Sequence, residues 1–207
     1  MPPLVSRFLI RINPFSLSLL SAYILGKIIH VLDFPAVVVN ILSGPTSAVA
    51  TTLSKSKIPT VLTMIGSTAT GQRVIADSAT SIKKLSMELG GNAPFVVFED
   101  AAIDKALDLA IGIKFGNSGQ ICVAANRCFV HKSLYNSFLE KYVERVKSLT
   151  LGFGIDQKPD MGPMVTRNDR DRMFDLINDA IEKGGVLLAG GEIPQGKEDG
   201  NWMIPIV

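Results

Sequence analysis

The fold class follows from the stretch TVLTMIGSTATG, residues 60–71. Its first half, 60–65, is an apolar run typical of a strand, and the run stops at the small and polar residues from Gly66 to Gly71. The residues after Gly71 predict a helix over 72–80. The alternation continues on both sides, with further strands expected at 37–42, 83–88, 94–98, 128–131 and 186–189, and further helices at 16–32, 46–54, 103–115, 134–149 and 167–183. Alternating strands and helices predict an α/β fold with a mostly parallel sheet.

Two adjacent glycines, Gly90 and Gly91, interrupt this alternation. A boundary at this point divides the chain into residues 1–89 and residues 90–207. The second part contains a regular amphipathic helix, because the apolar side chains of Leu134, Phe138 and Tyr142 fall on one stripe. We therefore expect two α/β domains with their boundary at residue 90.

The composition limits the kinds of partner and site. The chain has 207 residues, of which 47% are hydrophobic, and this is enough to bury a core. The net charge of +2 predicts no nucleic-acid partner, because phosphate binding needs a concentrated basic surface. Two cysteines are too few for a disulfide framework, and no cluster of His and Cys has the spacing of metal ligands, so no metal site is predicted.

The first 32 residues contain no Asp or Glu, but they contain Arg7, Arg11 and Lys27 among several serines. This composition weakly resembles a mitochondrial transit peptide, so a cytoplasmic and a mitochondrial location both stay open. The preferred interpretation is a buried helix over 16–32, because its apolar residues fall on most faces. The uncharged run 15–26 is too short to span a bilayer, and no membrane association is predicted.

Three features could carry chemistry, and each also has a plain structural explanation. The segment from Gly66 to Gly71 could present backbone N–H groups to a phosphate, or it could be an ordinary helix cap. Cys122 could be a nucleophile whose thiolate is favoured at the start of a helix, although a buried, inert cysteine is commoner. Glu88 could be a general base beside the flexible glycine pair, or a surface glutamate.

The order of the three features is more specific than any one of them. The segments GSTATG (66–71), MELGGN (87–92) and NSGQIC (117–122) follow one another, and Glu88 and Cys122 are 34 residues apart (122 − 88). This order and spacing resemble the aldehyde dehydrogenase superfamily. The stretches 66–71 and 119–127 are most similar to its succinate-semialdehyde dehydrogenase type, and the resemblance covers about residues 26–207.

The resemblance implies an enzyme that oxidises an aldehyde, with succinate semialdehyde as one candidate, to a carboxylic acid with NAD or NADP. Cys122 would form a thiohemiacetal and then a thioester, and Glu88 would activate the water that hydrolyses it. Residues 1–89 would be part of a Rossmann-like cofactor-binding domain, and 90–207 would be the first part of the catalytic α/β domain. The implied cofactor contacts are Gly44, Gly66, Ser67, Thr70, Gly71 and Leu89.

The chain also departs from the family. The upstream Trp-Asn-Phe-Pro-like motif with the oxyanion Asn, the Lys-Pro-Ser-Glu motif and the downstream Glu-x-Phe-Gly-Pro motif do not occur. We therefore expect a chain truncated at both ends, without the strands through which the family forms homo-oligomers, and with little or no activity alone. The alternative function is that of a catalytically incompetent fragment or pseudoenzyme that binds a full-length relative.

A few single residues indicate which substrate and which related activities the chain favours. In the succinate-semialdehyde type, an Arg six residues before the nucleophile binds the substrate carboxylate. That position is Gly116 here, which favours a neutral or different aldehyde unless Lys114 compensates. Ala124 stands where some members have a second, redox-active Cys, and Cys128 is expected to pack as a small hydrophobic residue. Glu88 argues against a related reductase of acyl phosphates, because such an enzyme needs no hydrolytic base.

Overall fold

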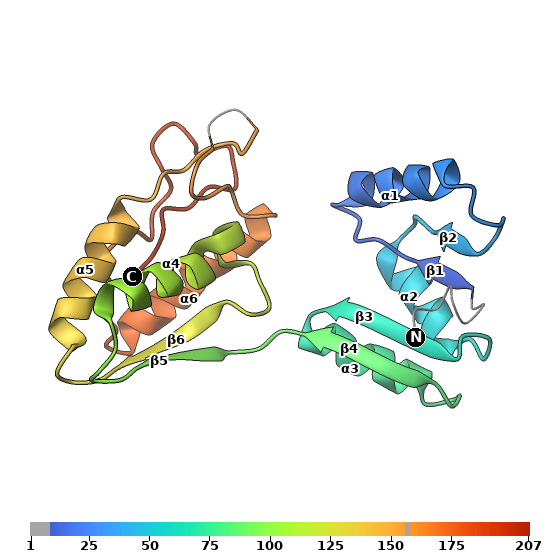
Figure 1. Ribbon diagram of the computed structural model, residues 1–207, viewed down its shortest axis with the longest axis horizontal. Coiled ribbons are helices and arrows are strands. Elements are labelled where there is room, and N and C mark those ends of the chain that lie inside the picture. The colour runs from blue at the N-terminus through green and yellow to red at the C-terminus, as the bar shows by residue number, and fades with distance from the viewer. Residues whose placement is uncertain (1–8, 156–157) are drawn as a thin grey trace. The chain divides into compact units, whose positions relative to one another are not determined.

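The computed structural model describes residues 9–155 and 158–207. The chain divides into two compact units, Met1–Leu89 and Gly90–Val207, here called unit 1 and unit 2. Strands alternate with helices through unit 1 and through unit 2 as far as residue 147, and every described strand pair is parallel (Figure 1). The predicted α/β fold is therefore confirmed. The strands form three two-stranded sheets rather than one continuous sheet.

Unit 1 contains two successive strand–helix–strand arrangements. Its elements are β1 (Ile10–Ile12), α1 (Leu19–Val31), β2 (Val39–Ile41), α2 (Thr46–Lys55), β3 (Val61–Gly66), α3 (Thr68–Ser78) and β4 (Lys84–Leu89). Strand β1 pairs with β2, and β3 pairs with β4. A helix connects the two strands of each pair, because parallel neighbours need a crossover connection.

The sheet β3–β4 is covered on one face only. Side chains alternate along both strands, with Leu62 and Met64 half-buried and Val61 and Ile65 exposed. Helix α3 contacts both strands, and helix α2 packs against α3. In the parallel register, Ile65 lies opposite Glu88 and Gly66 lies opposite Leu89. The face that carries Glu88 is therefore the exposed one.

The N-terminal segment differs from the sequence-based expectations in one strand and in the burial of one helix. Residues 10–12 form a strand that the sequence did not indicate, because three residues are too few to show a period. Helix α1 forms as expected, but none of its residues is buried, and Leu20 and Val31 are 79% and 72% exposed. The reason is that α1 packs on β2, where Gly26 faces Ile41, while most of its other apolar side chains stay exposed.

Unit 2 holds most of the buried apolar residues. Its elements are β5 (Ala93–Val97), α4 (Ile103–Phe115), the 3₁₀ turn η1 (Gly116–Gly119), β6 (Ala125–Val130), α5 (Tyr135–Lys147) and α6 (Arg167–Glu182). One core cluster consists of Val97, Leu107, Ala110 and Phe138, from β5, α4 and α5. A second cluster consists of Phe115, Val146 and Met161.

The strand predicted at 186–189 is wrong. Within the described part of the chain these residues form no strand, although Leu188 and Ala189 bond to the backbone of Val207. The Leu188 N–H donates to the Val207 carbonyl at 2.8 Å, and the Val207 N–H donates to the Ala189 carbonyl at 3.1 Å. Gly190 and Gly191, with φ of +71° and +81°, leave the extended conformation and so interrupt the ladder, although the Ile204 N–H donates to the Glu192 carbonyl at 2.9 Å beyond them.

Candidate active site

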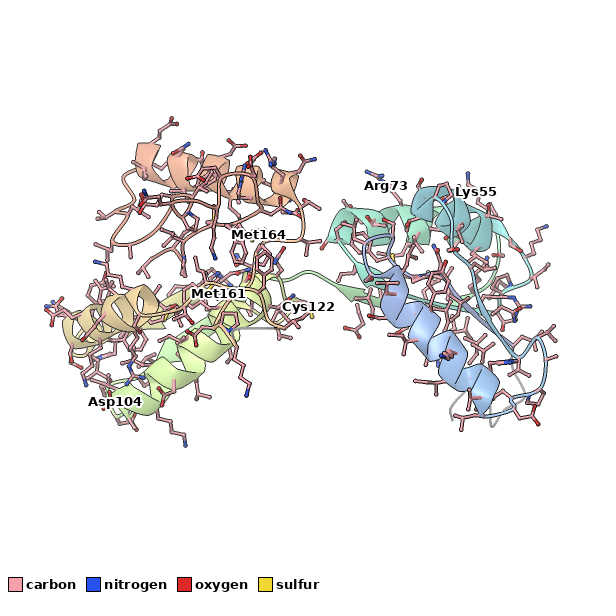
Figure 2. All side chains as sticks on the ribbon, turned by 90° about the horizontal axis from the view of Figure 1, so that it is seen from above. Lys55, Arg73, Asp104, Cys122, Met161 and Met164 are labelled. Atoms are coloured by element: carbon pink, nitrogen blue, oxygen red, sulfur yellow. The ribbon has the colours of Figure 1, made fainter. Side chains whose placement is uncertain are left out.

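Cys122 lies in a turn between η1 and β6, and it is exposed. Figure 2 labels it beside the segment that carries Met161 and Met164, and this segment accepts a hydrogen bond from Ser118 and donates one to Gln120. The expectation that Cys122 starts a helix is wrong. Helix α4 ends at Phe115, and the chain after the turn pairs with β5 as a strand, so no helix begins there. The alternative of a buried cysteine is wrong, because Cys122 is exposed.

Glu88 lies in β4 on the exposed face of the β3–β4 sheet. Its strand partner is Ile65, which is 83% exposed, so the carboxylate faces solvent beside an apolar side chain. Two residues later the glycine pair begins, and for Gly90 and Gly91 an added Cβ would meet nothing within 4 Å. Glu88 belongs to unit 1 and Cys122 to unit 2, so the pairing of the two rests on the sequence.

Five of the six predicted cofactor contacts, all except Gly44, come together where β3 ends and α3 begins. Gly66 is the last residue of β3 and lies opposite Leu89 in the sheet. Gly71 is buried in α3, and a Cβ there would lie 2.7 Å from both Cδ atoms of Leu89. Glycine at position 71 therefore lets α3 pack closely on the end of β4. Gly44 lies apart from this group in sequence, in the turn between β2 and α2.

Ser67 is the N-cap of α3. Its Oγ accepts a hydrogen bond from the Thr70 N–H at 3.2 Å and lies 2.9 Å from the Thr70 Oγ1. The glycine-bounded loop expected over 66–71 is therefore shorter than predicted, because the helix already begins at Thr68. The helix-cap interpretation is confirmed. It does not exclude an anion, because the other N–H groups of the first turn have no partner within the helix.

Lys114 is tied to the start of the β5–β6 sheet. Its Nζ donates to the Asn126 Oδ1 at 3.2 Å, and the Asn126 Nδ2 donates to the Gly91 carbonyl at 3.4 Å. Burial lowers the pKa of Lys114. Gly116, two residues later, has room for a side chain, since an added Cβ would meet only Ile121 Cδ1 at 3.4 Å. The sequence did not single out Asn126, because an isolated Asn carries no signal.

Cys128 differs from Cys122 in its surroundings. It lies in β6 as expected, opposite Phe95, but the residue is exposed rather than packed as a small hydrophobic side chain. Partial burial raises the pKa of its thiol. Burial, and secondarily the nearby Cys128, raises the pKa of Tyr142 to about 12. Both groups are therefore neutral near pH 7.

A family profile described as "Aldehyde dehydrogenase family" matches residues 2–207. The chain belongs to the aldehyde dehydrogenase family. The match begins well before residue 26, so β1 and α1 are part of the family domain as well.

Among the residues that the structure describes, no group of three His, Cys, Asp or Glu could hold a metal ion. No helix in the described ranges is long and apolar enough to cross a bilayer.

Succinate-semialdehyde dehydrogenases are among the relatives of this aldehyde dehydrogenase chain. "Succinate-semialdehyde dehydrogenase [NADP(+)] GabD" of Escherichia coli is 36% identical over 206 residues, which cover 100% of this chain and 42% of the relative. "Succinate-semialdehyde dehydrogenase, mitochondrial" of Oryza sativa is 35% identical over 92% of this chain and 36% of its own length. The predicted resemblance to this type is confirmed.

A solved structure shares the fold as well. The structure described as "Crystal structure of E. coli NADP dependent enzyme" superposes with a TM-score of 0.92 and 36% identity, over 96% of this chain and 41% of that one. The chain therefore spans less than half the length of the relatives that it matches.

Proposed function

We propose that this chain carries the nucleophile and the general base of an NAD(P)+-dependent aldehyde dehydrogenase, which oxidises an aldehyde to a carboxylic acid. The observation that carries the proposal is the exposed position of Cys122, in a turn within the segment that matches the family. A nucleophilic thiol must be reachable by its substrate, and a buried structural cysteine is not. This function fits a cytoplasmic or a mitochondrial location.

Cys122 acts first in the proposed reaction. Its thiolate forms an S–C bond to the aldehyde carbon, and the carbonyl oxygen becomes an oxyanion that the Cys122 N–H stabilises. When bound, the nicotinamide cofactor would supply the acceptor for the hydride that leaves this carbon. The oxyanion then re-forms a C=O bond, which leaves a thioester on Cys122.

Glu88 acts in the second half. Its carboxylate takes a proton from a water molecule, which attacks the thioester carbon, and the S–C bond breaks to return the Cys122 thiolate and release the acid. The glycines that follow Glu88 have no neighbour within 4 Å of an added Cβ, which leaves the backbone room to adjust.

The residues around the end of β3 suit a dinucleotide. Gly66 offers no side chain in front of the first turn of α3, and Ser67 leaves N–H groups of that turn open to a pyrophosphate. Leu89, packed on Gly71, would support the nicotinamide, and Gly44 and Thr70 would lie on the adenine side. NAD and NADP both fit this proposal, and the E. coli relatives are described as NADP-dependent.

Gly116 favours an uncharged aldehyde. A carboxylate-bearing aldehyde such as succinate semialdehyde needs a cationic partner, and glycine supplies none. Lys114 does not replace it readily, because its Nζ already donates to Asn126 and its burial disfavours the charged form. We therefore expect hexanal to react better than succinate semialdehyde.

The test is the acylation of Cys122. The purified Glu88→Gln variant is incubated with NADP+ or NAD+ and either hexanal or succinate semialdehyde, and the adduct is located by peptide mass spectrometry. We expect an acyl group on Cys122, because the thioester forms but hydrolyses slowly without the base. Cys128→Ser, the matched control, should leave the adduct unchanged. A folded chain that forms no adduct with either aldehyde would show that the proposal is wrong.

A second function is favoured by the exposed apolar side chains of unit 1. Leu20 and Val31 of α1, and Val61 and Ile65 of β3, are all more than half exposed. Such surfaces mark interaction sites, so the chain would be a non-catalytic partner of a full-length relative. Size-exclusion chromatography with E. coli succinate-semialdehyde dehydrogenase tests it: co-elution supports the partner function, and a separately eluting monomer contradicts it.

A further inference from the structure

The backbone just before Cys122 has an unusual conformation. Asn117, Ser118 and Gly119 have φ of +49°, +58° and +75°, so three consecutive residues are left-handed. Only glycine adopts this region without cost, and an added Cβ at Gly119 would also come within 3.1 Å of the Lys114 carbonyl. Asn117 and Ser118 need contacts elsewhere to hold them in this conformation.

Those contacts come from a segment more than 40 residues away. The Ser118 hydroxyl donates to the Gly162 carbonyl at 2.8 Å, and the Gln120 Oε1 accepts from the Val165 N–H at 2.9 Å. The Nε2 of the Gln120 side chain also donates to the Asn117 carbonyl at 3.2 Å, which adds a hydrogen bond within the loop. Two side chains thus join the loop to residues 162–165.

Residues 162–165 are themselves held in place by other parts of unit 2. The Met164 N–H donates to the Asn201 carbonyl at 2.9 Å, and the Asn201 side chain donates to the Val165 carbonyl at 3.3 Å. Met161 is buried in the core cluster with Phe115, the residue at which α4 ends. The segment is therefore a firm support, and the loop is held against it.

The chain is also held just after Cys122. Ala124 is 2% exposed, and its N–H donates to the Ile121 carbonyl at 3.1 Å, which closes a turn around the cysteine. Cys122 thus projects between a tether at Gln120 and a buried residue at Ala124. Its thiol is exposed while the backbone on both sides is fixed.

We propose that Ser118 and Gln120 are positioning residues that hold Cys122 in the orientation needed to attack the aldehyde. The inference rests on the proposed function of Cys122 as nucleophile. A reacting atom displaced by about 1 Å loses up to roughly a hundredfold in rate, whereas alkylation by a small reagent needs only an exposed thiol. The two reactions of Cys122 therefore respond differently to loss of the tethers.

The experiment measures both reactions in the full chain that carries Glu88→Gln. Gln120→Ala and Ser118→Ala are each added, and Cys122 is followed by mass spectrometry during acylation by hexanal with NADP+ and during alkylation by iodoacetamide. We expect acylation to fall about tenfold or more, with alkylation nearly unchanged. Gln120→Glu, which retains an acceptor for the Val165 N–H, should recover part of the loss. Gln195→Ala, at an exposed position, is the matched control and should change neither reaction.

The outcomes separate this inference from the function on which it rests. If both tether variants are acylated as fast as the parent chain, the positioning role alone is overturned. A parallel loss of acylation and alkylation also overturns it, because it indicates a collapsed loop. No adduct in the parent chain overturns the proposed function itself, and the positioning role with it.

Discussion

At the scale of single residues, Gly190 is the position where the backbone leaves least room. Its φ is +71°, and an added Cβ would lie only 1.8 Å from the Pro205 carbonyl oxygen. Gly190→Ala should therefore lower the free energy of unfolding of unit 2, by roughly 1–3 kcal/mol from backbone strain alone, with the collision adding to it. Urea unfolding followed by circular dichroism measures the change.

The control for this substitution is Gly112→Ala, inside α4. An added Cβ at Gly112 meets nothing within 4 Å, and alanine is the better helix former. Gly112→Ala should raise the stability, opposite in sign to Gly190→Ala. If both substitutions changed the stability equally, the close approach at Gly190 would not be the cause.

At the scale of elements, Thr150 and Asp160 join the two sides of the bridge between Leu151 and Met161. The Asp160 carboxylate accepts from the Thr150 hydroxyl at 2.6 Å and from the Thr150 N–H at 2.8 Å. These bonds, the hydroxyl first, lower the pKa of Asp160, because they favour the charged form. The contribution to stability is thus present above the pKa of the unfolded state and is lost as the pH falls through the lower folded pKa.

Asp160→Asn tests this direction. The variant should be less stable than the parent at pH 7, and the difference should shrink as the pH falls below about 4, the ordinary pKa of an Asp in the unfolded chain. Urea unfolding from pH 7 to pH 3 measures it. Asp175→Asn is the control, since Asp175 is exposed on α6 and has no hydrogen bond among the described residues. A difference that stays constant with pH would rule out the carboxylate as the source.

At the scale of the whole molecule, the buried apolar residues are unevenly divided. Among the described residues, Val74 is the only buried apolar side chain of unit 1, while unit 2 contains both core clusters. Apolar burial is the main favourable term in folding, so the local stability of unit 1 should be lower. Amides of β3 and β4 should therefore exchange hydrogen faster than those of β5 and β6 in exchange mass spectrometry. Equal protection in both sheets would contradict this.

The sequence by itself determined the α/β class, most of the elements and the family, and it predicted the candidate site. The alternation of apolar runs with Gly and Ser breaks predicted the α/β class, because strand and helix periods are local properties of the chain. The order of GSTATG, Glu88 and NSGQIC indicated the family. The same local reasoning missed β1, whose three residues show no period, and it predicted a strand at 186–189 where the positive φ of Gly190 and Gly191 interrupts the pairing.

Only the tertiary structure decided what surrounds Cys122. Local sequence indicated a helix start, but pairing of the following residues with β5 makes them a strand. The tethers from Ser118 and Gln120 connect residues more than 40 positions apart, and no local pattern encodes a contact over that separation. The exposure of α1 was also outside the reach of the sequence, since an apolar helix shows what it needs to bury but not which neighbour will cover it.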